Sequence, residues 1–294
     1  MKKFRYFFFS FLFPFIINAQ PSITSNINPA VGDVYNFTII KDTVIMHNPG
    51  PSGNGVAWHF VGFRDSSGFD FTYSDTTGKP FNSRVFPRSN LAMKEAGSAA
   101  SGKFAFYHQD NNRYAQNADL FFLGGNYFVV PYDEYLDLLR FPLTYGQTFT
   151  NQDTADWILN LFGSTIMRRY VTSTTIYDGY GTLQFKAGSV LNNISRIHIL
   201  QTIKDTVNQN GALPVVANTV RDIYMWFNNS NKKPIMYWQK ESTFSNLANL
   251  VTYKVLIDNV VLGIADNKTN AQIKIYPNPA TDKILSLIHI SEPT

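Results

Sequence analysis

Val220-Arg-Asp-Ile-Tyr-Met-Trp-Phe227 is the stretch that decides the fold class. Its large side chains alternate, so that Tyr224 and Trp226 fall on one side of the chain and Ile223 and Met225 on the other. A repeat of two residues is the period of a β-strand, whose successive side chains point to opposite faces. The segment therefore predicts a strand.

The same pattern recurs in both directions from this segment. Ile197, Ile199 and Ile203 share one face upstream, and turn-forming residues such as Gly124-Gly125-Asn126 separate the segments. Strands are expected at residues 34–40, 56–63, 103–108, 120–130, 194–203, 235–239 and 251–257. So many short alternating segments predict an all-β protein, and we expect an antiparallel β-sandwich. The pattern leaves its subtype, jelly-roll or immunoglobulin-like, open.

Two segments are ambiguous. Residues 132–140 carry acidic residues early, leucines late and an arginine at the end, which favours one or two helical turns. Residues 153–163 place Trp157 and Leu161 on one helical face between an aspartate and a glycine. A short helix fits this second pattern, but so does a strand entering a hairpin.

The amino-acid composition excludes several kinds of catalytic site, metal site and partner. The chain has no cysteine, which excludes thiol catalysis, cysteine-ligated zinc and disulfide bonds. A body of about 240 residues can bury a sufficient core without such cross-links. Three of the 25 Lys and Arg residues lie within residues 1–19, so 22 basic residues remain against 21 acidic ones. This near-neutral charge does not predict nucleic acid or an anionic membrane as a partner.

The first 19 residues have the order of a secretory signal peptide. Lys2, Lys3 and Arg5 precede an apolar run at residues 7–17, and a small residue, Ala19, ends the segment. We expect signal peptidase to cleave between Ala19 and Gln20. An N-terminal membrane anchor is the alternative, but the run is shorter than the about 20 residues that a spanning helix needs. We therefore expect no transmembrane segment after cleavage.

A second segment that resembles an export signal lies near the C-terminus. After a polar linker in residues 258–270 the chain reads Ile273-Lys-Ile-Tyr-Pro-Asn-Pro-Ala-Thr-Asp-Lys-Ile284. This segment resembles the opening of the type A sorting domain of the type IX secretion system. The matching residues are Ile275, Tyr276, Pro277, Asn278, Pro279, Ala280 and Asp282. The resemblance implies that the type IX machinery carries the protein through the periplasm to the outer cell surface or the medium.

The final ten residues, Leu285-Ser-Leu-Ile-His-Ile-Ser-Glu-Pro-Thr294, look like the translation of a sequencing adapter. The alternative is a natural strand, since these residue types are compatible with β-structure. The expected organisation is therefore a signal peptide at 1–19, a β-rich body at 20–262, a linker with the start of a sorting domain at 263–284, and an artefact at 285–294.

The body offers little recognisable chemistry. His47, His59, His108 and His198 have no metal-ligand spacing, and no nucleophile elbow, HExxH motif or phosphate-binding glycine loop is present. The acidic group Asp133, Glu134 and Asp137 suits a solvated face or a helix start better than a catalytic pair. We expect no catalytic residue, no metal ligand and no cofactor, although a site built from distant residues stays open.

The four tryptophans raise the question of sugar binding. An exposed aromatic platform would stack on sugar rings, but Trp226 and Trp238 alternate with large apolar residues, which favours core positions for these two. The tryptophans are Trp58, Trp157, Trp226 and Trp238.

Two further resemblances concern short motifs. Asp178-Gly-Tyr-Gly-Thr-Leu183, followed by residues 191–197, resembles a segment of uncharacterised exported proteins that carry this sorting domain, and it implies no activity. Four Asp-Thr-apolar triplets resemble acceptor sites for O-glycosylation in bacteria that use this export route. The threonines are Thr43, Thr76, Thr154 and Thr206.

These observations predict a secreted or cell-surface protein that acts in non-catalytic binding or adhesion, with a glycan or another surface molecule as its partner. The alternative is a secreted hydrolase that acts on polysaccharide through a site assembled from residues far apart in the sequence. Two facing carboxylates in a cleft would favour the hydrolase.

Overall fold

A computed structural model describes residues 20–41, 47–62, 65–76, 86–95, 103–123, 126–160, 164–186, 189–208, 215–228, 231–245 and 249–259. The chain divides into two units, Met1–Ile264 and Ala265–Thr294, and all described residues belong to the first. Ala19, the sorting-motif residues from Tyr276 to Asp282 and the adapter-like end lie outside the described residues.

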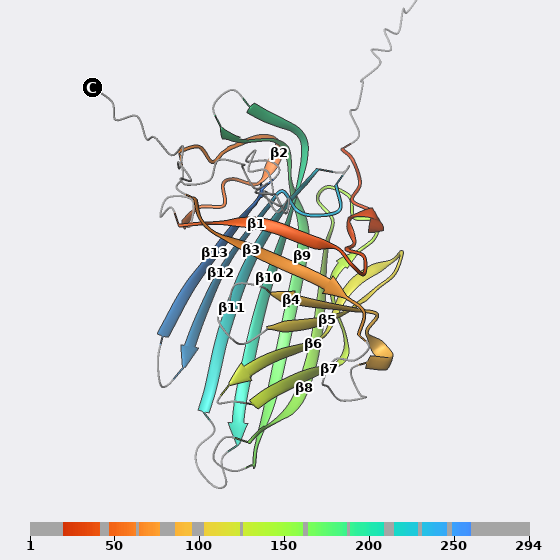
Figure 1. Cartoon of the computed structure of the whole chain (residues 1–294), viewed down its shortest axis with the longest axis vertical. Helices are drawn as coiled ribbons and strands as arrows, with labels where there is room; N and C mark the ends of the chain where they lie inside the picture. The colour runs from red at the N-terminus through yellow and green to blue at the C-terminus, as the bar shows by residue number, and fades with distance from the viewer. Residues whose placement is uncertain are drawn as a thin grey trace, which may run out of the picture. The chain divides into compact units, whose positions relative to one another are not determined.

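The described body consists almost entirely of β-strands, which confirms the all-β prediction (Figure 1). Two short 3-10 helices, η1 (Ser25–Ile27) and η2 (Phe86–Arg88), accompany them. The strands are β1 (Val34–Ile40), β2 (Gly53–His59), β3 (Asp65–Ser74), β4 (Leu91–Glu95), β5 (Phe104–Gln109), β6 (Arg113–Leu123), β7 (Asn126–Arg140), β8 (Thr148–Asn160), β9 (Ser164–Lys186), β10 (Ser189–Asn208), β11 (Val215–Asn228), β12 (Met236–Ser245) and β13 (Asn249–Asp258).

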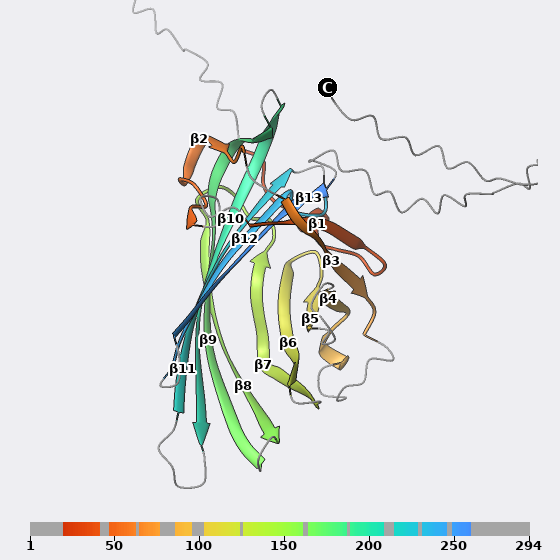
Figure 2. The same cartoon turned by 60° about the vertical axis from the view of Figure 1, so that its left-hand side comes forward.

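All thirteen strands belong to one hydrogen-bonded sheet. Its order is β2-β9-β10-β11-β12-β13-β1-β3-β4-β5-β6-β7, and β8 pairs with the first half of β9. The sheet curls, so that strands β8–β13 form one half and strands β1 and β3–β7 face them as the other (Figure 2). The two facing layers are therefore parts of one continuous sheet.

A short seam joins the two halves. Only three residue pairs connect β1 to β13, namely Phe37 with Asp258, Thr38 with Ile257 and Ile39 with Leu256. Pairing is antiparallel throughout the described strands except where β2 lies parallel to the second half of β9.

The helical turns expected at residues 132–140 are wrong, because this segment is part of β7. Tyr132 and Leu136 are buried in a cluster with Trp157, and pairing with β6 fixes the extended backbone. These tertiary contacts outweigh the weak local helix preference. Asp137 is not on a solvated face either. It is 3% exposed and forms ion pairs with the guanidinium groups of Arg113 and Arg140.

The second ambiguous segment is a strand through Asn160. Residues 153–160 belong to β8, which forms a hairpin with β9 in the register Trp157 with Met167. Ala155 and Trp157 face the interior, whereas Ile158 is exposed. The strand reading follows from the alternation of buried and exposed positions, which has a period of two.

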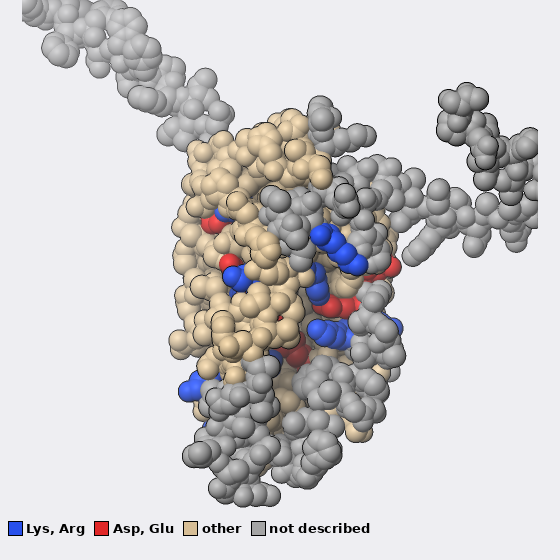
Figure 3. Space-filling model, turned by 90° about the vertical axis from the view of Figure 1, so that its left-hand side faces the viewer, with Lys and Arg blue, Asp and Glu red and all other residues tan. Residues whose placement is uncertain are grey.

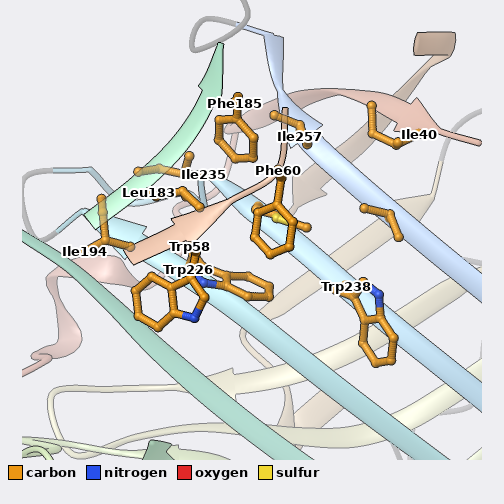
Figure 4. Packing of buried hydrophobic residues seen from close by; sticks show 12 residues of the cluster. Ile40, Trp58, Phe60, Leu183, Phe185, Ile194, Trp226, Ile235, Trp238 and Ile257 are labelled. Atoms are coloured by element: carbon orange, nitrogen blue, oxygen red, sulfur yellow. The ribbon is translucent and has the colours of Figure 1, made fainter. Parts of the chain in front are cut away.

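Hydrophobic clusters cover both faces of the half of the sheet that consists of β8–β13. Three clusters lie between the two halves of the sheet; Ile197 belongs to the first, Phe37 to the second and Val130 to the third. A fourth lies on the outer face under β2, where Trp58 and Phe60 cover Trp226 (Figure 4). The four tryptophans are 0–8% exposed, which confirms the core prediction for Trp226 and Trp238.

The Asp178–Leu183 motif holds β2 in place. A Cβ atom on Gly181 would lie 1.8 Å from the backbone oxygen of Val56, and one on Gly179 would lie 2.7 Å from the ring of Trp58. Only glycine permits such a close approach of two backbones. The motif therefore has a packing role, because it lets β2 seal the outer cluster.

Candidate functional site

A cavity of about 350 Å³ lies between the two halves of the curled sheet. Its lining comes from the N-terminal segment, from β1 and β3–β7, and from the inner face of β9–β13. One side is mainly aromatic and the other combines polar with apolar side chains; we call the aromatic group of the first side the tyrosine wall and the polar group of the second side the polar wall. The tyrosine wall consists of Tyr35, Tyr73, Tyr107 and Tyr114 with Phe71; the polar wall consists of Arg169, Gln201, Arg221, Gln239 and Glu241.

The tyrosine wall is built by alternation in four strands of one half. The ring centroids of Tyr35 and Tyr73 are 4.9 Å apart, and those of Tyr107 and Tyr114 stack at 4.7 Å. Burial raises the pKa of Tyr73, Tyr107 and Tyr114 well above the ordinary tyrosine value. These phenols therefore stay neutral and keep their O–H groups as donors near neutral pH.

Arg221 and Glu241 form the centre of the polar wall. They are directly opposite each other on β11 and β12, and the Arg221 Nε lies 2.8 Å from a Glu241 carboxylate oxygen. Arg221 also donates to the Gln201 oxygen at 3.1 Å, and Gln239 donates to Glu241 at 3.3 Å. Burial alone would raise the pKa of Glu241, but the positive charge of Arg221 and its hydrogen bond lower it. Glu241 is therefore ionised.

Arg169 forms the second polar group. It donates two hydrogen bonds to Asp205, at 2.7 and 2.9 Å, and one to Asp119 at 3.3 Å. Asp119 also accepts a hydrogen bond from the Tyr132 hydroxyl at 3.2 Å and one from the side chain of Gln116. Both carboxylates are thus held by a half-buried guanidinium, and this network fixes the orientation of the side chains.

An ion pair spans the two halves at one side of the cavity. The Nζ atom of Lys254 on β13 lies 3.1 Å from both carboxylate oxygens of Glu95 on β4, and both residues belong to the lining. These two strands are not neighbours in the sheet. On the face nearest β13 the surface is hollowed, and side chains of both charge signs gather in the hollow (Figure 3).

The four histidines of the body, at positions 47, 59, 108 and 198, do not enter the lining. His59 contacts Gln184 at 2.8 Å, His108 contacts Asp110 at 3.3 Å, and His198 contacts Asp222 at 2.5 Å while stacking on a tyrosine ring. Across the described ranges, no group of three His, Asp or Glu side chains is arranged to hold a metal ion. The acidic residues Asp133, Glu134 and Asp137 are likewise not part of the cavity.

The three described threonines of the Asp-Thr triplets are half-buried, and their hydroxyls are hydrogen-bonded. Thr76 donates to the Ser89 carbonyl at 3.4 Å, Thr154 to the carboxylate of Asp133, and Thr206 to the Arg168 carbonyl at 3.2 Å. Thr43 lies outside the described residues. Gln20, which follows the predicted cleavage site, is half-buried at the start of the described chain.

Sequence reasoning missed the cavity, although a signal existed. Arg221 occupies the same face of its strand as Ile223 and Met225, and Gln201 lies between Ile199 and Ile203. A polar side chain at an inward position of an alternating strand predicts a buried polar site. The pairing that brings Gln201, Arg221 and Glu241 side by side required the register, which the pattern does not give.

No protein-family model, no curated protein and no solved structure matches this chain. Within the residues that the structure describes, no helix is both long enough and apolar enough to cross a membrane.

Proposed function

We propose that the chain is an exported, non-catalytic binding protein that holds a small organic ligand in the central cavity. The observation that carries this proposal is the lining of the cavity, where aromatic and aliphatic side chains surround a few fixed polar groups. Pockets of roughly 300–1,000 Å³ with such a lining are typical of small-molecule sites. The cavity lies at the lower end of that range, so a small ligand fits best.

The state of the carboxylates favours binding over hydrolysis. A glycosidase needs one carboxylic acid that keeps its proton, which requires a raised pKa. Arg221 lowers the pKa of Glu241, and Arg169 forms hydrogen bonds with both Asp119 and Asp205. The lowered pKa of Glu241 supports a hydrogen-bond acceptor at this position rather than an acid catalyst.

Export remains part of the proposal, supported by the signal-like residues 1–19 and by the sorting motif at residues 276–282. We propose the type IX route to the outer surface or the medium, with signal peptidase and that machinery as partners. Mass spectrometry of protein from the native host should find Gln20 as the first residue. An intact mass that also matches the unmodified chain would contradict O-glycosylation at Thr43, Thr76, Thr154 or Thr206.

Filling the cavity tests ligand binding. The probe is 1-aminoanthracene, a small neutral molecule whose fluorescence rises in apolar sites, titrated into the full chain. Ala105→Leu adds volume to the lining, and overpacking of this kind should weaken the probe at least about tenfold, which is about 1.4 kcal/mol. Ala217→Leu on β11, outside the lining, is the matched control and should leave the affinity unchanged.

A second substitution that fills the cavity guards against the case in which Ala105→Leu fails to fold. Met225→Phe enlarges a different lining residue and should give the same loss if both variants keep the wild-type circular dichroism. The proposal is wrong if the probe does not bind the wild type, or if both folded filling variants bind it as well as the wild type does.

A further inference from the structure

The two walls of the cavity differ in the ligand surface that they match. The tyrosine wall presents aromatic rings, with Tyr107 and Tyr114 stacked on each other and Phe71 in edge contact with Tyr237 at 6.4 Å. Flat aromatic surfaces pack against the apolar face of a ring compound, while tyrosine hydroxyls remain available at the ring edge. A ligand with a ring and polar substituents satisfies both properties of this wall.

The half-buried charged side chains of the cavity lining are paired within the protein, whereas the two other lysines of the lining, Lys103 and Lys232, are exposed to solvent. Arg221 is paired with Glu241, Arg169 with Asp205 and Asp119, and Lys254 with Glu95. An anionic ligand would have to displace a carboxylate from its guanidinium partner, and a cationic ligand would have to displace an arginine or lysine. Breaking a half-buried ion pair in this way leaves a charge without its partner, which is costly. The pairing of the half-buried charges therefore favours a ligand without net charge.

The polar wall also offers donors and acceptors side by side. Arg221 uses only the oxygen of the Gln201 amide, whose nitrogen carries two N–H donors, and Glu241 carries acceptor oxygens next to it. A hydroxyl group both donates and accepts, so neighbouring hydroxyls on one ring match this alternation. A hydrocarbon ring would leave these polar groups unsatisfied, which costs free energy when they are buried.

We propose that the ligand of the cavity is a neutral carbohydrate of one or two rings. This inference rests on the proposed binding function and names the chemical class that the cavity selects. The sugar ring lies against the tyrosine wall, and its hydroxyls bond to Gln201, Gln239 and Glu241 of the polar wall. The tryptophans are buried in the core, as the alternation predicts for Trp226 and Trp238, and tyrosines line the cavity instead.

Isothermal titration calorimetry on the full chain tests the class. The neutral probes are glucose, cellobiose, maltose and N,N′-diacetylchitobiose. Glucuronate and glucosamine are the charged counterparts of the glucose ring. At least one neutral sugar should bind, and the charged counterparts should bind at least about tenfold more weakly than glucose or not at all. Tighter binding of a charged counterpart would overturn the assignment.

Two neighbouring residues of β10 provide the site test. Gln201→Met keeps the side-chain length but removes the amide, and it should weaken the bound sugar at least about fivefold with little effect on 1-aminoanthracene. Thr202→Val changes the next residue, which faces the opposite side of the strand and is exposed, and should change neither affinity. Equal sugar affinity in wild type and Gln201→Met would overturn the proposed contacts.

Binding of 1-aminoanthracene distinguishes a failure of the carbohydrate assignment from a failure of the proposed binding function. If 1-aminoanthracene binds and Ala105→Leu weakens it while none of the sugars binds, the carbohydrate assignment is wrong and the binding function stands. If neither the probe nor any sugar binds, both are wrong.

Discussion

The guanidinium of Arg196 donates two hydrogen bonds to the carboxylate of Asp178, at 2.9 and 2.7 Å, in the interior of the outer-face cluster. Arg196 is 1% exposed, and the rings of Trp58, Tyr224 and Trp226 surround its guanidinium at 4.9–5.5 Å. Its remaining donors reach the carbonyls of residues 49 and 50 at 2.9 and 3.0 Å. One cation thus connects β9, β10, β11 and the segment that leads into β2.

Replacing Arg196 should therefore destabilise the fold strongly. Arg196→Met leaves the Asp178 carboxylate buried without its partner, and losses of this kind amount to about 3–5 kcal/mol. Urea denaturation followed by circular dichroism measures the change. Arg168→Met is the matched control, because Arg168 also donates two hydrogen bonds to an aspartate, Asp156, but on the exposed surface. It should change stability little; comparable losses in both variants would contradict the role given to burial.

A methyl group on Gly181 should detach β2. Gly181→Ala places a Cβ atom 1.8 Å from the Val56 oxygen, so the parallel pairing of β2 with β9 must shift. Because Trp58 is 1% exposed, its fluorescence should move to longer wavelength as water reaches the ring. Gly68→Ala is the control, since Gly68 also lies in a strand but has no atom within 4 Å of the added Cβ. A normal tryptophan spectrum in Gly181→Ala would refute the packing role of the motif.

The Lys254–Glu95 pair should control access to the cavity. Glu95→Gln removes the charge that links β4 to β13, at a cost of about 1 kcal/mol for a half-exposed pair. With this link weakened, 1-aminoanthracene should enter several times faster in stopped-flow mixing. Glu134→Gln removes an exposed carboxylate whose side chain is 85% accessible, and it should leave the rate unchanged. Identical association rates in wild type and Glu95→Gln would show that ligands enter elsewhere.

Two aspartates of β8 should respond to pH in opposite directions. Burial, together with the charge of Asp133, raises the pKa of Asp153 above the usual 3.8, despite backbone hydrogen bonds that lower it. A hydrogen bond from Arg168 lowers the pKa of Asp156. Because the pKa of Asp153 is higher in the folded than in the unfolded chain, the contribution of this residue to stability is present below the unfolded pKa. It is lost as the pH rises through the folded pKa. For the lowered pKa of Asp156, stability is present above 3.8 and is lost as pH falls.

Neutral replacements check these signs. Asp153→Asn should raise the free energy of unfolding at neutral pH, and the gain should vanish in acid. Asp156→Asn should lower it at neutral pH and have no effect in acid. Urea midpoints measured from about pH 3 to pH 7 give both trends. The explanation fails if the two variants shift the midpoint in the same direction at neutral pH.

Local pattern predicted the strands well where both faces carry large side chains. The range 34–40 of β1 was predicted to the residue, and the alternation at 220–227 assigned the correct faces of β11. Pattern failed at residues 132–140, where pairing with β6 and burial under Trp157 decide the conformation. The curling of the sheet could not be predicted from these patterns either. It depends on which strands pair with each other, and the pattern within a single strand does not show this.

The cavity was hidden for a related reason. Tyr107 and Arg169 look like ordinary alternating residues in their own strands, and only the curled sheet brings them to one space with Arg221. The tight contact of Gly181 with Val56 joins residues that are far apart in the sequence. Such long-range relationships carry no local period, so a single sequence does not reveal them.

The seam between β1 and β13 also dictates the order in which the body can assemble. Thr38 donates a hydrogen bond to Asn259, 221 positions later, at 2.7 Å. A chain that emerges from a channel N-terminus first must carry β1 with one edge unpaired until β13 has arrived, and unpaired edges invite aggregation. Closing so long a loop is slow, because its entropy is lost before the contacts form. Among the described strands, β13 therefore completes the curled sheet, after the strands that precede it have been released.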